Sequence, residues 1–136
     1  MEKSVLIAIK GGLFVIEKCL RDILEETKTE SKSRNWLLKE RHSDISDHAA
    51  AQLTIKAEEM LKEIQELQNM FNIGKDTESA RWRVISDLTQ IWTILSDLSP
   101  SRLLGYGRMQ PEEDNLLTLR VDRMNAIRED MEKILS

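Results

Sequence analysis

The chain has 136 residues and a mass of 15.8 kDa, which is the size of one folded domain. Hydrophobic residues make up 40% and charged residues 32% of the chain, a composition that argues against intrinsic disorder. The net charge of −4 disfavours a nucleic-acid-binding protein, because such proteins usually present a basic surface.

The first predicted element is a helix over residues 4–27. An apolar residue recurs every three or four positions, which places one stripe on one helix face: Ile9, Leu13, Ile16, Leu20 and Ile23. Further apolar residues make the first half hydrophobic nearly all round: Val5, Leu6, Ile7, Ala8, Phe14 and Val15. A helix that is apolar on every side is buried on every side. Either this helix lies at the centre of a bundle, or another chain covers its outer face.

Residues 5–16 also allow a second interpretation. Two apolar runs flank Gly11 and Gly12, a pattern that is typical of a β-hairpin. An isolated hairpin is only marginally stable, and no other segment looks like a strand that could join it. The run is too short, and Lys10 and the charges after Ile16 are too close, for a membrane span.

A polar connection over residues 28–42 is interrupted by Trp36, Leu37 and Leu38. Fifteen residues are many for a loop in a bundle. We therefore expect these three apolar residues to dock as a short helical turn over the end of the core.

The second predicted helix covers residues 44–72. Its stripe has the clearest helical spacing in the chain: Leu53, Ala57, Met60, Ile64, Leu67 and Phe71. Any of Ser43, Asp44 and Ser46 can cap its first turn. Gly74 is expected at the C′ position, where a positive φ is needed.

Three helical segments are predicted in the second half. A helix over residues 77–98, capped by Asp76 or Thr77, presents Ile85, Leu88, Trp92 and Leu95 on one face. Ser99 and Pro100 begin a short helix over residues 100–104, and Gly105, Tyr106 and Gly107 form a break. The last helix covers residues 111–135, and its inward stripe has six members: Leu117, Val121, Met124, Ile127, Met131 and Ile134.

These patterns predict an all-α protein with a single domain over residues 1–136. We expect a four-helix up-down bundle with one extra short helix between the third and fourth long helices. The tryptophans are expected to fill the core, with Trp82 the most exposed of them. Cys19, the only cysteine, is expected in the core or at its boundary, and it predicts a reducing, cytoplasmic location.

No combination of residues in the sequence is typical of a catalytic site. The leading hypothesis is therefore a non-enzymatic protein–protein interaction or assembly module, a homodimer that associates through the first helix. We expect no cofactor, no nucleic-acid partner and no membrane partner.

The second hypothesis is a small helical metal-dependent nucleotide hydrolase. Glu63-Ile64-Gln65-Glu66 resembles the first half of the Glu-x-x-Glu and Glu-x-x-Asp motifs of helical nucleotide pyrophosphohydrolases. This resemblance covers four residues and implies magnesium or manganese bound by carboxylates, here Glu59, Glu63, Glu66 and Asp87. The acidic residues of the helix predicted over residues 77–98 do not have the Glu-x-x-Asp spacing of the second motif.

The third hypothesis is a module that binds a small or anionic ligand. Arg102, Tyr106 and Arg108 lie near the start of the last helix, where a helix N-terminus attracts anions, and Trp82 could supply a stacking surface. The alternative is that these arginines pair with Glu112, Glu113 and Asp114.

Overall fold

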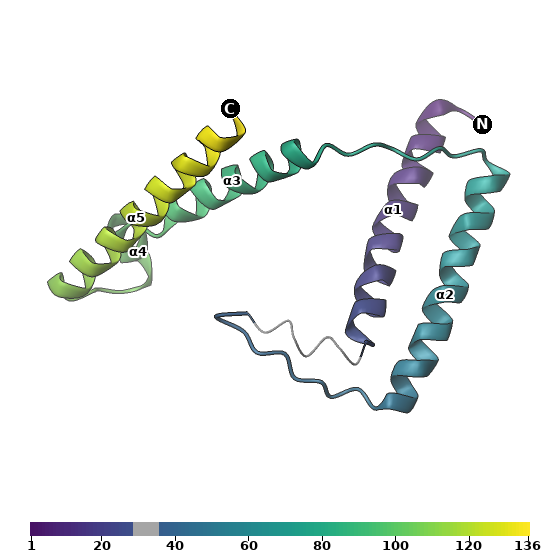
Figure 1. The fold of residues 1–136 in the computed structure, drawn as a ribbon, viewed down its shortest axis with the longest axis horizontal. Helices are drawn as coiled ribbons and strands as arrows, with labels where there is room; N and C mark the ends of the chain where they lie inside the picture. Colours follow the sequence, from purple (N-terminus) through teal and green to yellow (C-terminus); the bar gives the residue numbers. More distant parts are fainter. Residues whose placement is uncertain (29–35) are drawn as a thin grey trace. The chain divides into compact units, whose positions relative to one another are not determined.

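The computed structural model describes residues 1–28 and 36–136, and all regular secondary structure in them is helical. Six segments follow in chain order: α1 (Lys3–Glu26), α2 (Asp47–Met70), α3 (Ala80–Asp97), α4 (Pro100–Leu103), the 3₁₀-helix η2 (Leu104–Tyr106) and α5 (Pro111–Leu135) (Figure 1). The contacts divide the chain into two compact units, Met1–Lys75 and Asp76–Ser136. The all-α class and the short helix before the last long helix are thereby confirmed.

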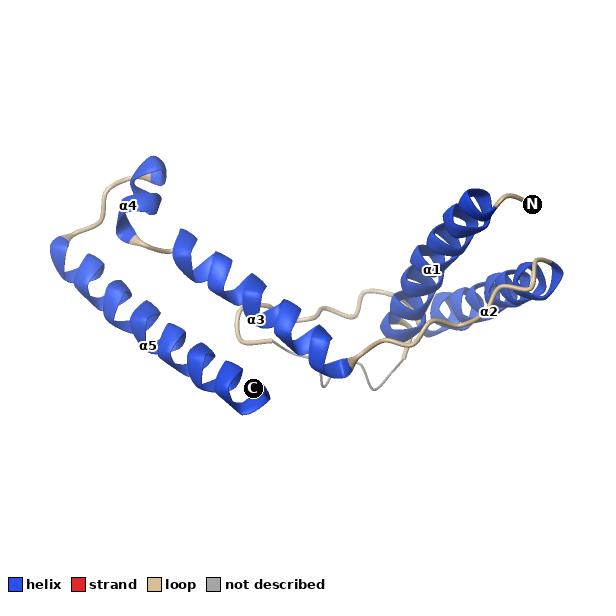
Figure 2. Cartoon of the chain, turned by 90° about the horizontal axis from the view of Figure 1, so that it is seen from above, coloured by secondary structure: helices blue, strands red, loops and turns tan. Residues whose placement is uncertain are grey.

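The first unit is an antiparallel pair formed by α1 and α2, which lie side by side in both views (Figures 1 and 2). α1 continues without interruption through Gly11 and Gly12, so the β-hairpin interpretation of residues 5–16 is wrong. Leu20 and Ala57 are the buried residues of the two helices, with 5% and 4% of their surface exposed. Near one end of the pair, the side-chain oxygens of Thr27 and Thr54 are hydrogen-bonded at 3.1 Å.

The ends of α2 follow the capping rules, though with different residues from some of those expected. Ser46 is the N-cap, and its hydroxyl oxygen accepts a hydrogen bond from the backbone N–H of Ala49 at 3.1 Å. Phe71 is the C-cap, and the residue after it, Asn72, has a φ of 54°. Asparagine tolerates this left-handed conformation, so the helix ends before Gly74 and does not need it.

The apolar trio in the connection between α1 and α2 does not cover the core. Trp36, Leu37 and Leu38 are highly exposed, with 77%, 104% and 97% of their surface accessible, and they form no helical turn. The expected docking is therefore wrong for these three residues. The remainder of the predicted connection includes residues 29–35, which lie outside the described part of the chain.

The second unit is built on a second antiparallel pair, α3 and α5. Ser79, and not Asp76 or Thr77, caps α3, because its hydroxyl oxygen accepts from the backbone N–H of Trp82 at 3.2 Å. At the start of α5, the Glu113 carboxylate accepts a hydrogen bond from the backbone N–H of Gln110 at 2.9 Å. Leu88 and Leu95 are the buried residues of α3.

The break before α5 begins later than expected. α4 passes directly into the 3₁₀-helix η2, so Gly105 and Tyr106 are helical. Residues 107–110 are not helical, and Gly107 has a φ of 146° that residues with a Cβ rarely adopt. The predicted break over residues 105–107 is thus corrected to residues 107–110.

The predicted core is only partly covered within each unit. Trp82 and Trp92 are 66% and 51% exposed, so the tryptophans do not fill the interior of the units. On α5 the residue buried against α3 is Arg128, which is 8% exposed, whereas Met124, Ile127, Met131 and Ile134 of the predicted stripe are exposed. Two packed helices bury only a narrow line of residues between them, which we call the seam. Because each apolar stripe is broader than the seam, the residues at its edge remain exposed to water.

Candidate interaction surface

One side of the first unit carries a continuous set of half-exposed apolar residues, which we call the first apolar face. It comprises Ile16 and Ile23 of α1 and Leu53 and Met60 of α2, which are 39% to 50% exposed. Each pair is spaced by seven residues, or about two helical turns, so each forms a stripe beside the buried seam. Because the helices are antiparallel, both stripes lie on the same side of the pair.

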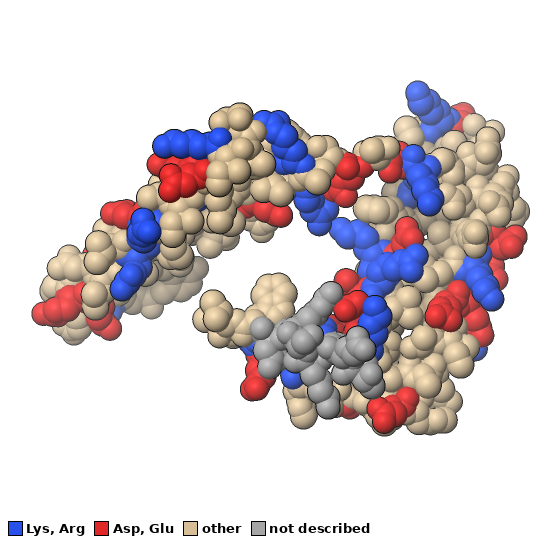
Figure 3. Space-filling model, in the orientation of Figure 1, with Lys and Arg blue, Asp and Glu red and all other residues tan. Residues whose placement is uncertain are grey.

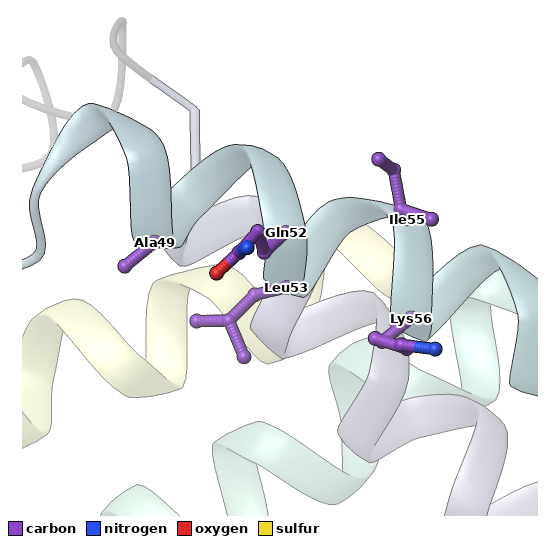
Figure 4. Close-up of a pocket in the computed structure, with 5 residues that line it drawn as sticks. All are labelled: Ala49, Gln52, Leu53, Ile55 and Lys56. Atoms are coloured by element: carbon purple, nitrogen blue, oxygen red, sulfur yellow. The ribbon is translucent and has the colours of Figure 1, made fainter.

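A shallow hollow lies on this side of the first unit. Its lining residues all belong to the first half of α2: Ala49, Gln52, Leu53, Ile55 and Lys56 (Figure 4). Leu53 and Ile55 point in different directions in the close-up, as residues two positions apart on a helix do. Residues of one helix cannot enclose a small molecule, so the hollow is a surface depression next to Leu53.

The second unit has a matching surface, which we call the second apolar face. It comprises Val84 and Ile91 of α3 and Met124 and Met131 of α5, which are 43% to 46% exposed. These residues also repeat every seven positions beside a buried seam. Each unit therefore presents one half-exposed apolar side that its own helices leave uncovered.

α1 carries a further patch on the side away from α2, which we call the outer patch: Ile7, Gly11 and Phe14. Ile7 and Phe14 are 62% and 56% exposed, and the ammonium of Lys18 lies 5.6 Å from the centre of the Phe14 ring. A Cβ built on Gly11 would meet no atom within 4 Å. Glycine in a helix interior destabilises it by about 1 kcal/mol relative to alanine, and the contacts within the chain do not require it here.

Charged side chains of both signs are interspersed with neutral ones over each unit in Figure 3.

The buried Arg128 was not expected from the sequence. Its Nε donates to the Asn125 side-chain oxygen at 3.0 Å, and its Nη1 donates to Glu132 at 2.5 Å, both on α5 itself. The signal was present, since Arg128 is seven residues after Val121, but a charged residue there looked like solvent-exposed surface.

The four residues expected to bind a ligand or partner lie at two places in the second unit. Trp82 is in the first turn of α3, whereas Arg102 is in α4, beyond the other end of that 18-residue helix. Tyr106 and Arg108 follow it and are exposed. Arg102 forms an ion pair with Asp97 at 3.8 Å, and not with the acids at the start of α5. Three of the four residues therefore lie within one short segment, residues 102–108, and Trp82 lies apart from them.

The expected metal-binding carboxylates belong to both units. Glu59, Glu63 and Glu66 lie on α2, and Asp87 lies on α3. Glu59 is paired with Lys56 at 3.3 Å. In residues 1–28 and 36–136, no three histidine, cysteine or acidic side chains are grouped closely enough to hold a metal ion.

Two other expectations concern α1 and the membrane. Cys19 is exposed on α1, which corrects its expected place at the core. Within the described ranges, no helix combines the length and the apolar character that crossing a membrane requires.

The sequence matches no known protein-family model, and neither the curated proteins nor the solved structures include a match to this chain.

Proposed function

We propose that this chain is a non-enzymatic protein–protein interaction or assembly module that self-associates through α1. The observation that carries the proposal is the outer patch, where Ile7 and Phe14 are more than half exposed. Exposed aromatic and aliphatic side chains grouped on one rigid element are the usual anchors of protein interfaces. The lone Cys19 leads us to propose the reducing cytoplasm as the location.

We also propose that the four long helices form an up-down bundle. What supports this proposal is that each unit, taken by itself, is an antiparallel pair of long helices with one half-exposed apolar side. Helices with an uncovered apolar side are the elements from which a bundle is built.

Sedimentation equilibrium over a concentration series tests the proposed self-association. We expect the average mass to rise from 15.8 kDa toward twice that value as the concentration increases from 1 to about 500 μM. A mass that stays at 15.8 kDa throughout would rule out the homodimer. Calorimetric titration with magnesium and with nucleotides tests the alternative hypothesis of a nucleotide hydrolase. We expect no heat of binding.

A further inference from the structure

We infer that two copies of the chain pair antiparallel along α1, with Phe14 of each copy packed over Gly11 of the other. This inference rests on the proposed self-association and names its contact. The outer patch contains both halves of the contact: an exposed aromatic side chain and, three residues earlier on the same face, a position with no side chain. A surface that carries a projection and its own complementary gap is suited to a two-fold symmetric interface.

The two glycines of α1 point to close approach by another chain. Neither Gly11 nor Gly12 has an atom within 4 Å of the place where a Cβ would be. Both lie within the helix, and neither has a positive φ, so the backbone conformation does not require glycine either. Helices approach most closely where side chains are absent. Of the two, Gly11 lies between Ile7 and Phe14 on the outer patch.

Charge complementarity selects the antiparallel direction. When Phe14 of one copy lies opposite Gly11 of the other, Lys10 of the first copy lies opposite residue 15 of the second. Glu17 of the second copy is then about 3 Å further along the helix axis. Lys10 and Glu17 lie on the same side of the contact, and the symmetry creates this pair twice. A parallel arrangement would instead bring the two Lys18 side chains face to face, because Lys18 lies on the outer patch beside Phe14.

One helix from each copy buries less than the roughly 1,200 Å² that stable interfaces require. The dimer is therefore weak, and its dissociation constant is expected in the upper micromolar range. This is why the measurements must extend to about 500 μM.

The first test fills the gap at Gly11. We expect Gly11→Leu to raise the dimer dissociation constant at least tenfold in sedimentation equilibrium, while circular dichroism shows unchanged or higher helicity. The matched control is Glu66→Leu, which adds the same side chain at an exposed position of α2 and should leave the constant unchanged. A wild-type dimer that Gly11→Leu does not weaken would overturn the inference and leave the proposed self-association standing.

The second test reverses the charges. Lys10→Glu and Glu17→Lys should each raise the dissociation constant about tenfold, because two opposite-charge pairs become like-charge pairs. The double variant Lys10→Glu/Glu17→Lys should restore the wild-type constant. Failure of that rescue would exclude the antiparallel alignment, whereas a monomeric wild type would already have excluded the proposed function.

Discussion

The guanidinium group of Arg81, in the first turn of α3, donates two hydrogen bonds to the backbone carbonyl oxygen of Leu135, the last residue of α5. The Nε and Nη2 atoms lie 3.1 and 2.6 Å from that oxygen. The last carbonyl groups of a helix have no partner within the helix, so this contact joins two helix ends that are 54 residues apart.

Replacing Arg81 with methionine removes this link and keeps an unbranched apolar stem. We expect Arg81→Met to lower the free energy of unfolding by about 1 kcal/mol, the net value of a hydrogen bond, since the site is exposed to water. Urea denaturation measures the change. Arg83→Met is the control, because Arg83 pairs with the exposed Glu78 and its replacement should change stability by less than about 0.5 kcal/mol. Equal losses in both variants would show that the Leu135 contact has no special role.

Leu88 is the most completely buried hydrophobic residue of the second unit among the residues described, with 3% of its surface exposed. Leu88→Ala should lower the free energy of unfolding by about 2–5 kcal/mol, because it removes buried methyl groups and leaves a cavity. Leu116→Ala, at a position 63% exposed on α5, should cost well under 1 kcal/mol. Thermal and urea unfolding of the two variants compare them, and similar losses would contradict the assigned seam between α3 and α5.

Arg128 is buried, yet its polar partners among the described residues all lie on its own helix. Burying a guanidinium group costs desolvation energy, and these contacts do no more than offset that cost. An apolar residue of similar volume at this position should therefore give a fold of similar stability. We expect Arg128→Met to leave the free energy of unfolding within about 1 kcal/mol of wild type, or to raise it. Glu132→Met should instead destabilise by about 1 kcal/mol or more, because it keeps the buried charge and removes a partner. A large loss in Arg128→Met with none in Glu132→Met would reverse this account.

The sequence by itself determined the helices. Periodic apolar residues located α1, α2, α3 and α5, and their bounds were predicted to within about three residues, because spacing and capping are local properties of the chain. Where the bounds were wrong, a neighbouring residue with the same chemistry took the role: Ser79 in place of Thr77 as a cap, and Asn72 in place of Gly74 after α2.

What only the tertiary structure decided is which part of each broad apolar stripe is covered. Leu20 and Leu88 are buried, whereas Ile16 and Trp92 in the same predicted stripes remain about half exposed. A helix with apolar residues over half its circumference can turn any of them toward a partner, and its own sequence does not distinguish these rotations. The opposing helix decides which of these residues is covered. The burial of Arg128 could therefore be recognised only from the packing of α5 with α3.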